Sequence, residues 1–168
     1  MKYVKRSFAA LFAVVLVLAA GCGKKASNKV VDYTVDVPSG FEEAEQDGVV
    51  KAWANPADNS NINVNITEKD AAFKSITADA LREALVELFE ESIGEAPTIT
   101  DKYFTSDEVC GMPAYQYCYT IEVIGVEMTQ LVVCIDADKT YTVTYTDTTG
   151  SWISEFEASA KNINLVFE

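Results

Sequence analysis

The sequence predicts an α+β fold, in which a mainly antiparallel sheet of about six to seven strands carries two packed helices. Three observations lead to this prediction. The expected elements follow the order β-β-β-α-β-β-β-β-α and end in a short strand, so helices separate the runs of strands. Each helix has one apolar stripe that a sheet must cover. The chain has 168 residues, which suits one domain.

Three strands are expected before the first helix. Residues 30–37 alternate apolar and polar side chains, as a half-buried strand does. Residues 49–54 follow the turn signal Asp47-Gly48 and form the second strand. Residues 61–67 alternate strictly and form the third strand. Its inward side chains are Ile62, Val64 and Ile66, and its outward side chains are Asn61, Asn63 and Asn65.

The first helix is expected from Thr77 to about Ser92. Thr77 is a favourable N-cap, and Asp79 lies in the first turn, where the helix dipole stabilises an acid. Gly94 can end the helix in the left-handed conformation. The stripe expected against the sheet consists of Leu81, Leu85, Leu88 and Phe89.

A meander of strands is expected after this helix. Its strands are residues 98–109, 114–123, 128–135 and 140–147. Gly111-Met112-Pro113 is expected to turn the first strand into the second, and Gly125 marks the next hairpin. A long antiparallel run of this kind supplies most of the predicted sheet.

The second helix closes the predicted domain. Thr149-Gly150-Ser151 can cap it, and residues 165–167 follow as a short apolar strand or tail. The side of this helix that faces the sheet is expected to consist of Trp152, Phe156, Ala160 and Ile163.

The amino-acid composition argues against several classes of function for this protein. The chain has no histidine, the commonest general base and transition-metal ligand, so Ser-His-Asp, Cys-His and His-liganded zinc sites are impossible. Its net charge is −13, and lysines cluster only near the N-terminus, which argues against nucleic-acid binding. We therefore expect no enzyme activity, no catalytic residue, no cofactor and no bound metal.

The N-terminal segment has the anatomy of a secretory signal. A cationic start precedes an apolar run from Phe8 to Ala20, which is too short to cross a bilayer permanently. Cys22 follows Leu18-Ala19-Ala20-Gly21, so the segment resembles a bacterial lipoprotein signal, although Ala19 stands where such signals usually carry leucine. In such signals the cysteine is lipidated and becomes the mature N-terminus. The alternative is plain secretion, with Ala19 and Gly21 as the small residues of ordinary cleavage.

The lipoprotein reading divides the chain into three parts: residues 1–21 as the signal peptide, 22–29 as a tether and 30–168 as one domain. The tether carries Lys24, Lys25 and Lys29, each worth about 1 kcal/mol near anionic headgroups. A lipid on Cys22 together with basic residues meets the requirement for stable anchoring. We expect the protein at the extracytoplasmic face of a cell membrane, held by this lipid anchor.

The order of elements and the residues at their joints resemble the superfamily of PsbP-like extrinsic proteins of the oxygen-evolving complex. DcrB-type periplasmic lipoproteins and a Ran-binding nuclear import factor share this fold. The resemblance covers about residues 30–168 and implies a sheet between helical layers, without shared catalytic residues. Its members act as docking or stabilising subunits. The matching features are Tyr33-x-Val35-x-Val37-Pro38-x-Gly40-Phe41, the Asn-Ile-Asn-Val strand, Gly111-Met112-Pro113-Ala114-Tyr115, Tyr141-x-Val143-x-Tyr145, Phe156 and Ile163.

Tyrosines form the main candidate ligand surface. Tyrosine offers an apolar ring and a polar tip, which suits recognition of a sugar or peptide. Aromatic rings fill the space between a sheet and a helix equally well, so core packing is the favoured interpretation and any exposed remainder is the candidate ligand surface. The candidates are Tyr115, Tyr117 and Tyr119 on one strand face and Tyr141 and Tyr145 on a later one.

Other polar patterns have simpler structural explanations. Asn61, Asn63 and Asn65 with Asp58 could hold calcium, but they lack the acidic density of a calcium loop, and a solvated strand face explains them. Asp136 and Asp138 could form a carboxylate pair, yet Asp-Ala-Asp-Lys suits a hairpin turn.

Three cysteines lie beyond Cys22. They are expected to be reduced core residues, because none lies in a CxxC pair. If a disulfide forms, the expected pair is Cys118–Cys134, because their midpoint falls beside Gly125 and would place them opposite each other in a hairpin. Cys110 has no partner in this register.

Two functions follow from these observations. The first is a membrane-anchored extracytoplasmic lipoprotein that acts as a non-enzymatic docking or assembly module for another envelope protein. The second is a lipoprotein that binds a small ligand, such as a sugar or lipid, on the tyrosine-rich face. The anchor and the missing catalytic equipment favour the first.

Overall fold

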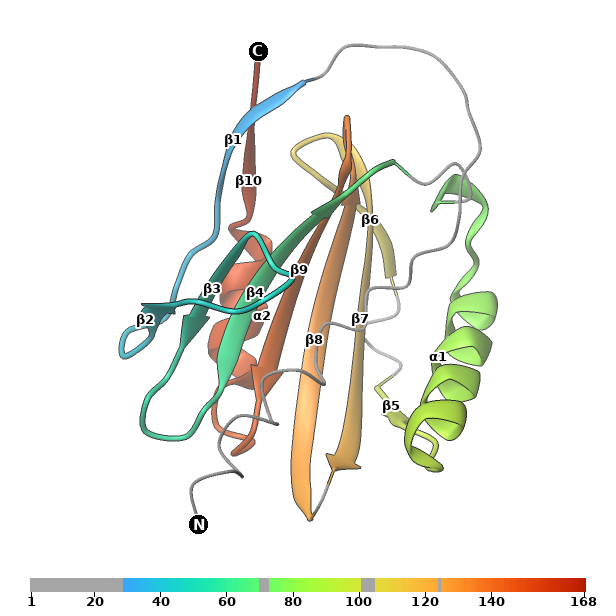
Figure 1. Cartoon of the computed structure of the whole chain (residues 1–168). Helices are drawn as coiled ribbons and strands as arrows, with labels where there is room; N and C mark the ends of the chain where they lie inside the picture. Colours follow the sequence, from blue (N-terminus) through green and yellow to red (C-terminus); the bar gives the residue numbers. More distant parts are fainter. Residues whose placement is uncertain (1–28, 70–72, 101–104, 124) are drawn as a thin grey trace.

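The structure, a computed structural model, describes residues 29–69, 73–100, 105–123 and 125–168 (Figure 1). The signal peptide, Cys22 and most of the tether lie outside these residues. The strands are β1 Val30–Thr34, β2 Glu42–Ala44, β3 Lys51–Ala54, β4 Asn61–Thr67, β5 Thr98–Ile99, β6 Thr105–Val109, β7 Met112–Val123, β8 Val126–Asp136, β9 Thr140–Asp147 and β10 Asn164–Phe167. The helices are the short 3₁₀ turn Phe73–Ser75, α1 Ala78–Ile93 and α2 Ile153–Lys161.

The predicted α+β class is confirmed. Within the described residues, the main sheet has eight strands in the order β2-β3-β4-β9-β8-β7-β5, and β6 pairs with the remaining part of β7. All of the pairings are antiparallel. The long strands β7 and β8 lie inside this order, and its ends are the short strands β2 and β5.

Two differences explain the larger strand number. The long strand expected at residues 98–109 is two strands, β5 and β6, which pair with successive parts of β7. The segment after Phe41, to which the sequence assigned no strand, forms β2 at the sheet edge. Both extra strands are too short to show a periodic pattern.

The first and last strands form a separate two-stranded antiparallel ribbon, β1–β10. Tyr33 pairs with Leu165, and Leu165 is buried in the same core as α2. At the end of the ribbon, the Glu168 N–H donates to the Lys29 carbonyl at 3.0 Å. The described part of the chain therefore begins and ends at one place.

Helix α1 begins and ends as predicted. The Thr77 hydroxyl accepts a hydrogen bond from the Ala80 N–H at 3.2 Å, and Gly94 adopts φ 81° at the C-terminus. Leu81, Leu85 and Phe89 are buried, whereas Leu88 is half-buried. The helix thus packs through a narrower stripe than predicted.

Helix α2 has the predicted buried side, but its N-terminus is capped differently. No capping hydrogen bond comes from the side chain before the helix. Instead, the buried Asp147 carboxylate accepts hydrogen bonds from the N–H groups of Thr149, Gly150 and Trp152 at 2.7–2.9 Å. An acceptor at the end of β9 therefore satisfies donors that would otherwise be unpaired before the helix.

The two helices cover opposite faces of the sheet. Phe156, Ala160 and Ile163 pack with the inward residues of β4, β8 and β9. Leu81, Leu85 and Phe89 pack with residues of β7 and β8 that point the other way. Figure 1 shows α1 beside β7 and α2 behind β4 and β9. The fold therefore has two apolar cores, one on each side of the sheet.

The hairpin turns differ in register from the sequence expectation. The β6–β7 turn is Cys110-Gly111, since Val109 pairs with Met112 and both turn residues have positive φ, 54° and 75°. This is the backbone pattern of a two-residue hairpin loop. Met112 and Pro113 therefore belong to β7 rather than to the turn.

The expected Cys118–Cys134 register is wrong. The β7–β8 loop has two residues, because Val123 pairs with Val126, so Cys118 lies opposite Leu131 and Cys134 lies opposite Tyr115. Cys118 belongs to the core under α2, and Cys134 packs against the core under α1. All three described cysteines are free thiols. Opposite faces prevent a disulfide between Cys118 and Cys134.

None of the described helices combines the length and apolar character that crossing a membrane requires.

Candidate functional site

The five candidate tyrosines do not share one face. Strand register places Tyr115 opposite Cys134 and Cys134 opposite Thr142, so Tyr115, Tyr117 and Tyr119 lie on the α1 side of the sheet. Tyr141 and Tyr145 pair with inward residues of β4 and β8 and lie on the α2 side. The two groups therefore cannot form a single platform.

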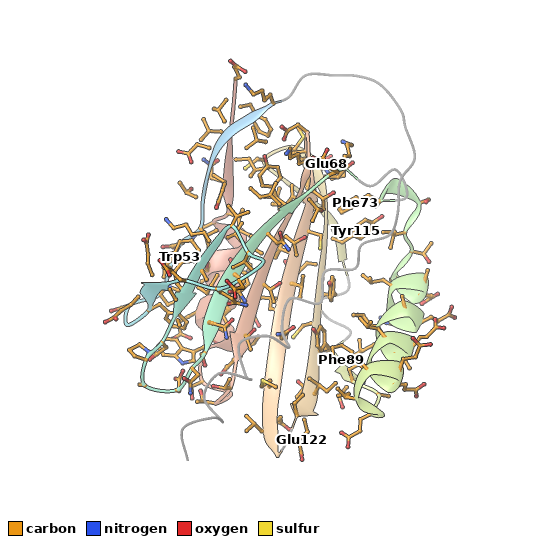
Figure 2. All side chains as sticks on the ribbon, in the orientation of Figure 1. Trp53, Glu68, Phe73, Phe89, Tyr115 and Glu122 are labelled. Carbon is orange, nitrogen blue, oxygen red and sulfur yellow. The ribbon has the colours of Figure 1, made fainter. Side chains whose placement is uncertain are left out.

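The α1-side tyrosines pack beneath and beside the helix. Tyr117 and Tyr119 are buried, and the Tyr119 ring centroid lies 5.0 Å from that of Phe89 in α1. Tyr115 is half-buried, donates its hydroxyl to the Ile76 carbonyl at 2.7 Å, and contacts the Phe73 ring (Figure 2). These contacts agree with the interpretation of these tyrosines as core residues.

The α2-side tyrosines are buried as well. Tyr145 is 0% exposed, and its hydroxyl lies 3.0 Å from the Ser159 hydroxyl of α2. Tyr141 donates to the Asp138 carboxylate at 3.2 Å, and burial, followed by the nearby Asp138 charge, raises its pKa to about 12. Both phenols are thus neutral at physiological pH and held in the core.

A series of side-chain hydrogen bonds runs from the core under α1 across the adjacent strands β7, β8 and β9, on one side of the sheet. The Tyr119 hydroxyl donates to the Gln130 side-chain oxygen, and Gln130 donates to the Thr146 hydroxyl at 3.0 Å. All three side chains are buried. Burial raises the pKa of Tyr119, so the phenol remains a donor. These hydrogen bonds link the aromatic core under α1 to the threonines of β9.

Those threonines belong to a continuous polar surface on β4 and β9. Four registered pairs place asparagine or threonine of β4 opposite threonine of β9. We call this surface the Asn/Thr face; the pairs are Asn61–Thr146, Asn63–Thr144, Asn65–Thr142 and Thr67–Thr140. The face lies on the same side of the sheet as α1. The sequence predicted a solvated face for the asparagines, but Asn63 is buried and Asn61 and Asn65 are half-buried. Alternation also groups the threonines of residues 140–147 on one face, but their pairing with β4 was missed because the two strands are far apart in the sequence.

Two polar atoms of the Asn/Thr face have no hydrogen-bond partner among the described residues: Asn63 Oδ1 and Thr140 Oγ1. Asn63 is only 5% exposed. Its Nδ2 group donates to Asn61 Oδ1 at 3.0 Å, so only the carbonyl end of the amide is unpaired. A buried acceptor without a partner costs free energy, and natural structures rarely tolerate one without a reason.

One end of the face carries an ion pair between the buried Asp136 and the more exposed Lys69. Asp136 pairs with Thr140 across β8 and β9 and is 2% exposed. The Lys69 ammonium lies 3.0 Å from Asp136 Oδ1 and also donates to the Ala137 carbonyl at 2.6 Å. The ion pair neutralises this end and ties the chain after β4 to the β8–β9 turn.

The other end of β9 is fixed by Asp147 and Asp58. Asp58 accepts a hydrogen bond from the Trp152 indole N–H at 2.8 Å and from the Ser60 N–H at 2.8 Å. Burial acts to raise the pKa of Asp58, but these hydrogen bonds outweigh it and leave the pKa lowered. The carboxylates thus join the β3–β4 loop to the segment before α2.

The thiols of the described residues are poorly suited to catalysis. Burial raises the pKa of Cys134 to about 11, so this thiol is protonated at neutral pH and unreactive as a nucleophile. The exposed Cys110 accepts a hydrogen bond from the Leu165 N–H at 3.3 Å and fixes the β6–β7 turn to β10. No group of three or more acidic or cysteine side chains suited to a metal occurs in the described ranges.

The geometry defines an α+β domain with one helix on each face of an antiparallel sheet, and comparison with solved structures shows that this is a PsbP-like fold. The solution structure of the cyanobacterial PsbP protein CyanoP from Synechocystis sp. PCC 6803 is similar, with a TM-score of 0.61 and 14% identity over 88% of this chain and 98% of that chain. No family model and no curated protein matches the sequence.

Two further solved structures have lower similarity. A protein from Bacteroides thetaiotaomicron VPI-5482 has a TM-score of 0.49 and 12% identity, over 81% of this chain and 46% of that one. LpqN, involved in cell envelope biogenesis of Mycobacterium tuberculosis, has a TM-score of 0.47 and 11% identity, over 80% of this chain and 83% of that one.

Proposed function

We propose that this protein is a membrane-anchored extracytoplasmic lipoprotein that acts as a non-enzymatic docking or assembly module for another envelope protein. The lipid on Cys22 would hold the domain at the membrane surface, and the domain would present its faces to the partner. The N-terminal sequence supports the anchor, and the geometry of the domain supports a binding role over catalysis.

One observation carries the argument against catalysis. Asp136 and Asp147 are the fully buried carboxylates of the described residues, and both serve the fold. Asp147 accepts the donors before α2, and Asp136 pairs with Lys69. A general acid or base needs a carboxyl group free to exchange a proton with a substrate. Asp136 and Asp147 are both engaged by partners within the fold, so neither carboxyl group is available to exchange a proton with a substrate.

The path of the chain also suits a tethered module. The domain begins at Lys29 beside Glu168, with an ion pair of 3.0 Å between their side chains. The β1–β10 ribbon at this point packs against the core under α2, through Tyr33 and Leu165. A tether that enters there is attached on the α2 side of the sheet, so a partner on the α1 side would not have to displace it.

Replacing the anchor residue tests the location and the role together. Cys22→Ser should move the protein from the membrane fraction to the soluble fraction, because a lipid can no longer be attached. Cross-linking in intact cells, followed by purification from membranes, should recover a specific envelope protein with the wild type and less of it with Cys22→Ser.

Two outcomes contradict the proposal. If Cys22→Ser remains on the membrane to the same degree, the anchor is wrong. If the anchored wild type cross-links to no protein above the level of an unrelated lipoprotein, the docking role is wrong. Ser27→Ala in the tether serves as the matched control, since it changes one hydroxyl near the anchor and keeps Cys22.

A ligand-binding role remains the second candidate, but on a different surface. Four of the five candidate tyrosines are buried, so they offer little surface to a sugar or lipid. The observation that favours a ligand is the unpaired Asn63 Oδ1 on the Asn/Thr face.

A further inference from the structure

We propose that the Asn/Thr face of β4 and β9 binds an extended, uncharged glycan strand of the cell envelope. Two features of the face support this proposal: its hydrogen-bonding, uncharged side chains and its two unpaired atoms. Only the source of the glycan, the cell envelope, rests on the proposed function.

The chemistry of the face matches a hydroxyl-rich ligand. It consists only of asparagine and threonine, so it carries no charge and no large apolar side chain. Carboxamides and hydroxyls each donate and accept hydrogen bonds. On the same side of the sheet, β3 adds Ala52 and Ala54, and β8 adds Gln130, Val132, Cys134 and Asp136. Val132 and Cys134 belong to or pack against the core under α1, and the charged neighbour Asp136 is paired with Lys69. A protein partner would be expected to meet aromatic or apolar anchors instead.

The charge of the protein narrows the ligand further. The whole chain has a net charge of −13, so an acidic polymer would be repelled. Lys69, at one end of the face, is already paired with Asp136. An uncharged glycan avoids both the repulsion and the need for a free cation.

The two unpaired atoms define the length of the ligand. Asn63 lies opposite Thr144, which is four residues along β9 from Thr140. At about 3.3 Å per residue, the two positions are roughly 13 Å apart. A single sugar ring is shorter than this distance, whereas a strand of sugars along β9 can supply a hydroxyl or acetamido donor to Asn63 Oδ1 and a partner to Thr140 Oγ1.

Neither described helix covers the Asn/Thr face. Helix α1 packs over β7 and β8, and α2 lies on the opposite side of the sheet. Among the described helices, the face is therefore open to an external ligand.

Binding of a defined glycan tests the inference. The probe is an uncharged tetrasaccharide of β-1,4-linked N-acetylglucosamine, added to full-length protein in detergent, with calorimetry and saturation-transfer NMR as readouts. Wild type should bind, and Asn63→Ala and Thr144→Val should each weaken binding about fivefold to tenfold, the effect of one lost hydrogen bond. Thr144→Val keeps the shape and strand propensity of the side chain, so it separates loss of binding from loss of fold.

The matched control is Thr120→Val on the opposite face of the sheet, where Thr120 and Thr129 hydroxyls lie 2.8 Å apart. It should bind like the wild type. No binding of the tetrasaccharide by wild type, or equal weakening by Thr120→Val, overturns the inference. A photo-cross-linker at position 144 that captures a protein instead of glycan also overturns it. Retained binding by the released Cys22→Ser protein supports the site even if the docking role fails.

Discussion

Leu85→Ala tests whether α1 is bound to the sheet as tightly as its buried stripe indicates. Leu85 is 2% exposed and packs among Phe89, Tyr117 and Tyr119. The substitution keeps helix propensity high, so the loss comes from packing. Removing three buried carbons at about 0.8 kcal/mol each, together with a residual cavity, predicts a loss of roughly 2.5–4 kcal/mol in the free energy of unfolding.

Urea unfolding, followed by tryptophan fluorescence and by far-ultraviolet circular dichroism, measures this loss. The two tryptophans, Trp53 and Trp152, belong to or pack against the core under α2, so fluorescence reports the side of the sheet away from α1. Circular dichroism reports α1 directly. Coincident transitions would indicate one cooperative unit. A fall in melting temperature of roughly 6–12 °C should accompany the loss.

Leu88→Ala is the matched control, since Leu88 lies on the same helix but is half-buried. It should cost clearly less than Leu85→Ala. A loss below about 1 kcal/mol for Leu85→Ala, or equal losses for both variants, would refute the assigned stripe.

Three further predictions follow from the buried polar groups. Asp147→Ala should cost about 2–4 kcal/mol in urea unfolding, because it removes the buried acceptor of several hydrogen bonds before α2, and a cost below about 0.5 kcal/mol would contradict the capping role. Alkylation of native protein should label Cys110, whereas Cys118 and Cys134 should react only after unfolding; a Cys118–Cys134 bridge in non-reduced peptide maps would show that the strand register is wrong. Burial raises the pKa of Tyr141 from 10.0 to about 12, so the folded state favours the neutral phenol. The stabilisation that this preference gives is fully present below pH 10 and is lost as the pH rises toward 12. A near-ultraviolet titration in which every tyrosine ionises near pH 10 would contradict this burial.

Local signals predicted the elements well. Strict alternation predicts residues 61–67, which are the bounds of β4. Thr77 and Gly94 predict both ends of α1, because their capping chemistry depends on neighbouring residues alone. Elements without such signals were missed: β2 has three residues and β5 has two, too few for any period to be visible.

Pairing between strands could not be predicted with the same success. The period of two groups Tyr115, Tyr117 and Tyr119 on one face, but it does not say which face α1 covers. The β7–β8 register differs from the expected one by three residues, because Cys118 lies opposite Leu131 rather than Cys134. An odd shift places Cys118 and Cys134 on opposite sides of the sheet. The Asn/Thr face needs the pairing of β4 with β9, which no local pattern encodes.

The short strands at the ends of the main sheet affect how easily two copies of the domain can pair edge to edge. An exposed edge strand is a template on which a neighbouring copy can add a strand and begin to aggregate. Here the longest strands, β7 and β8, are paired on both sides, while one edge is the three-residue β2 with Glu42 and Glu43 exposed. The charge and the short length of β2 together discourage strand addition, so neighbouring copies of the domain can remain separate.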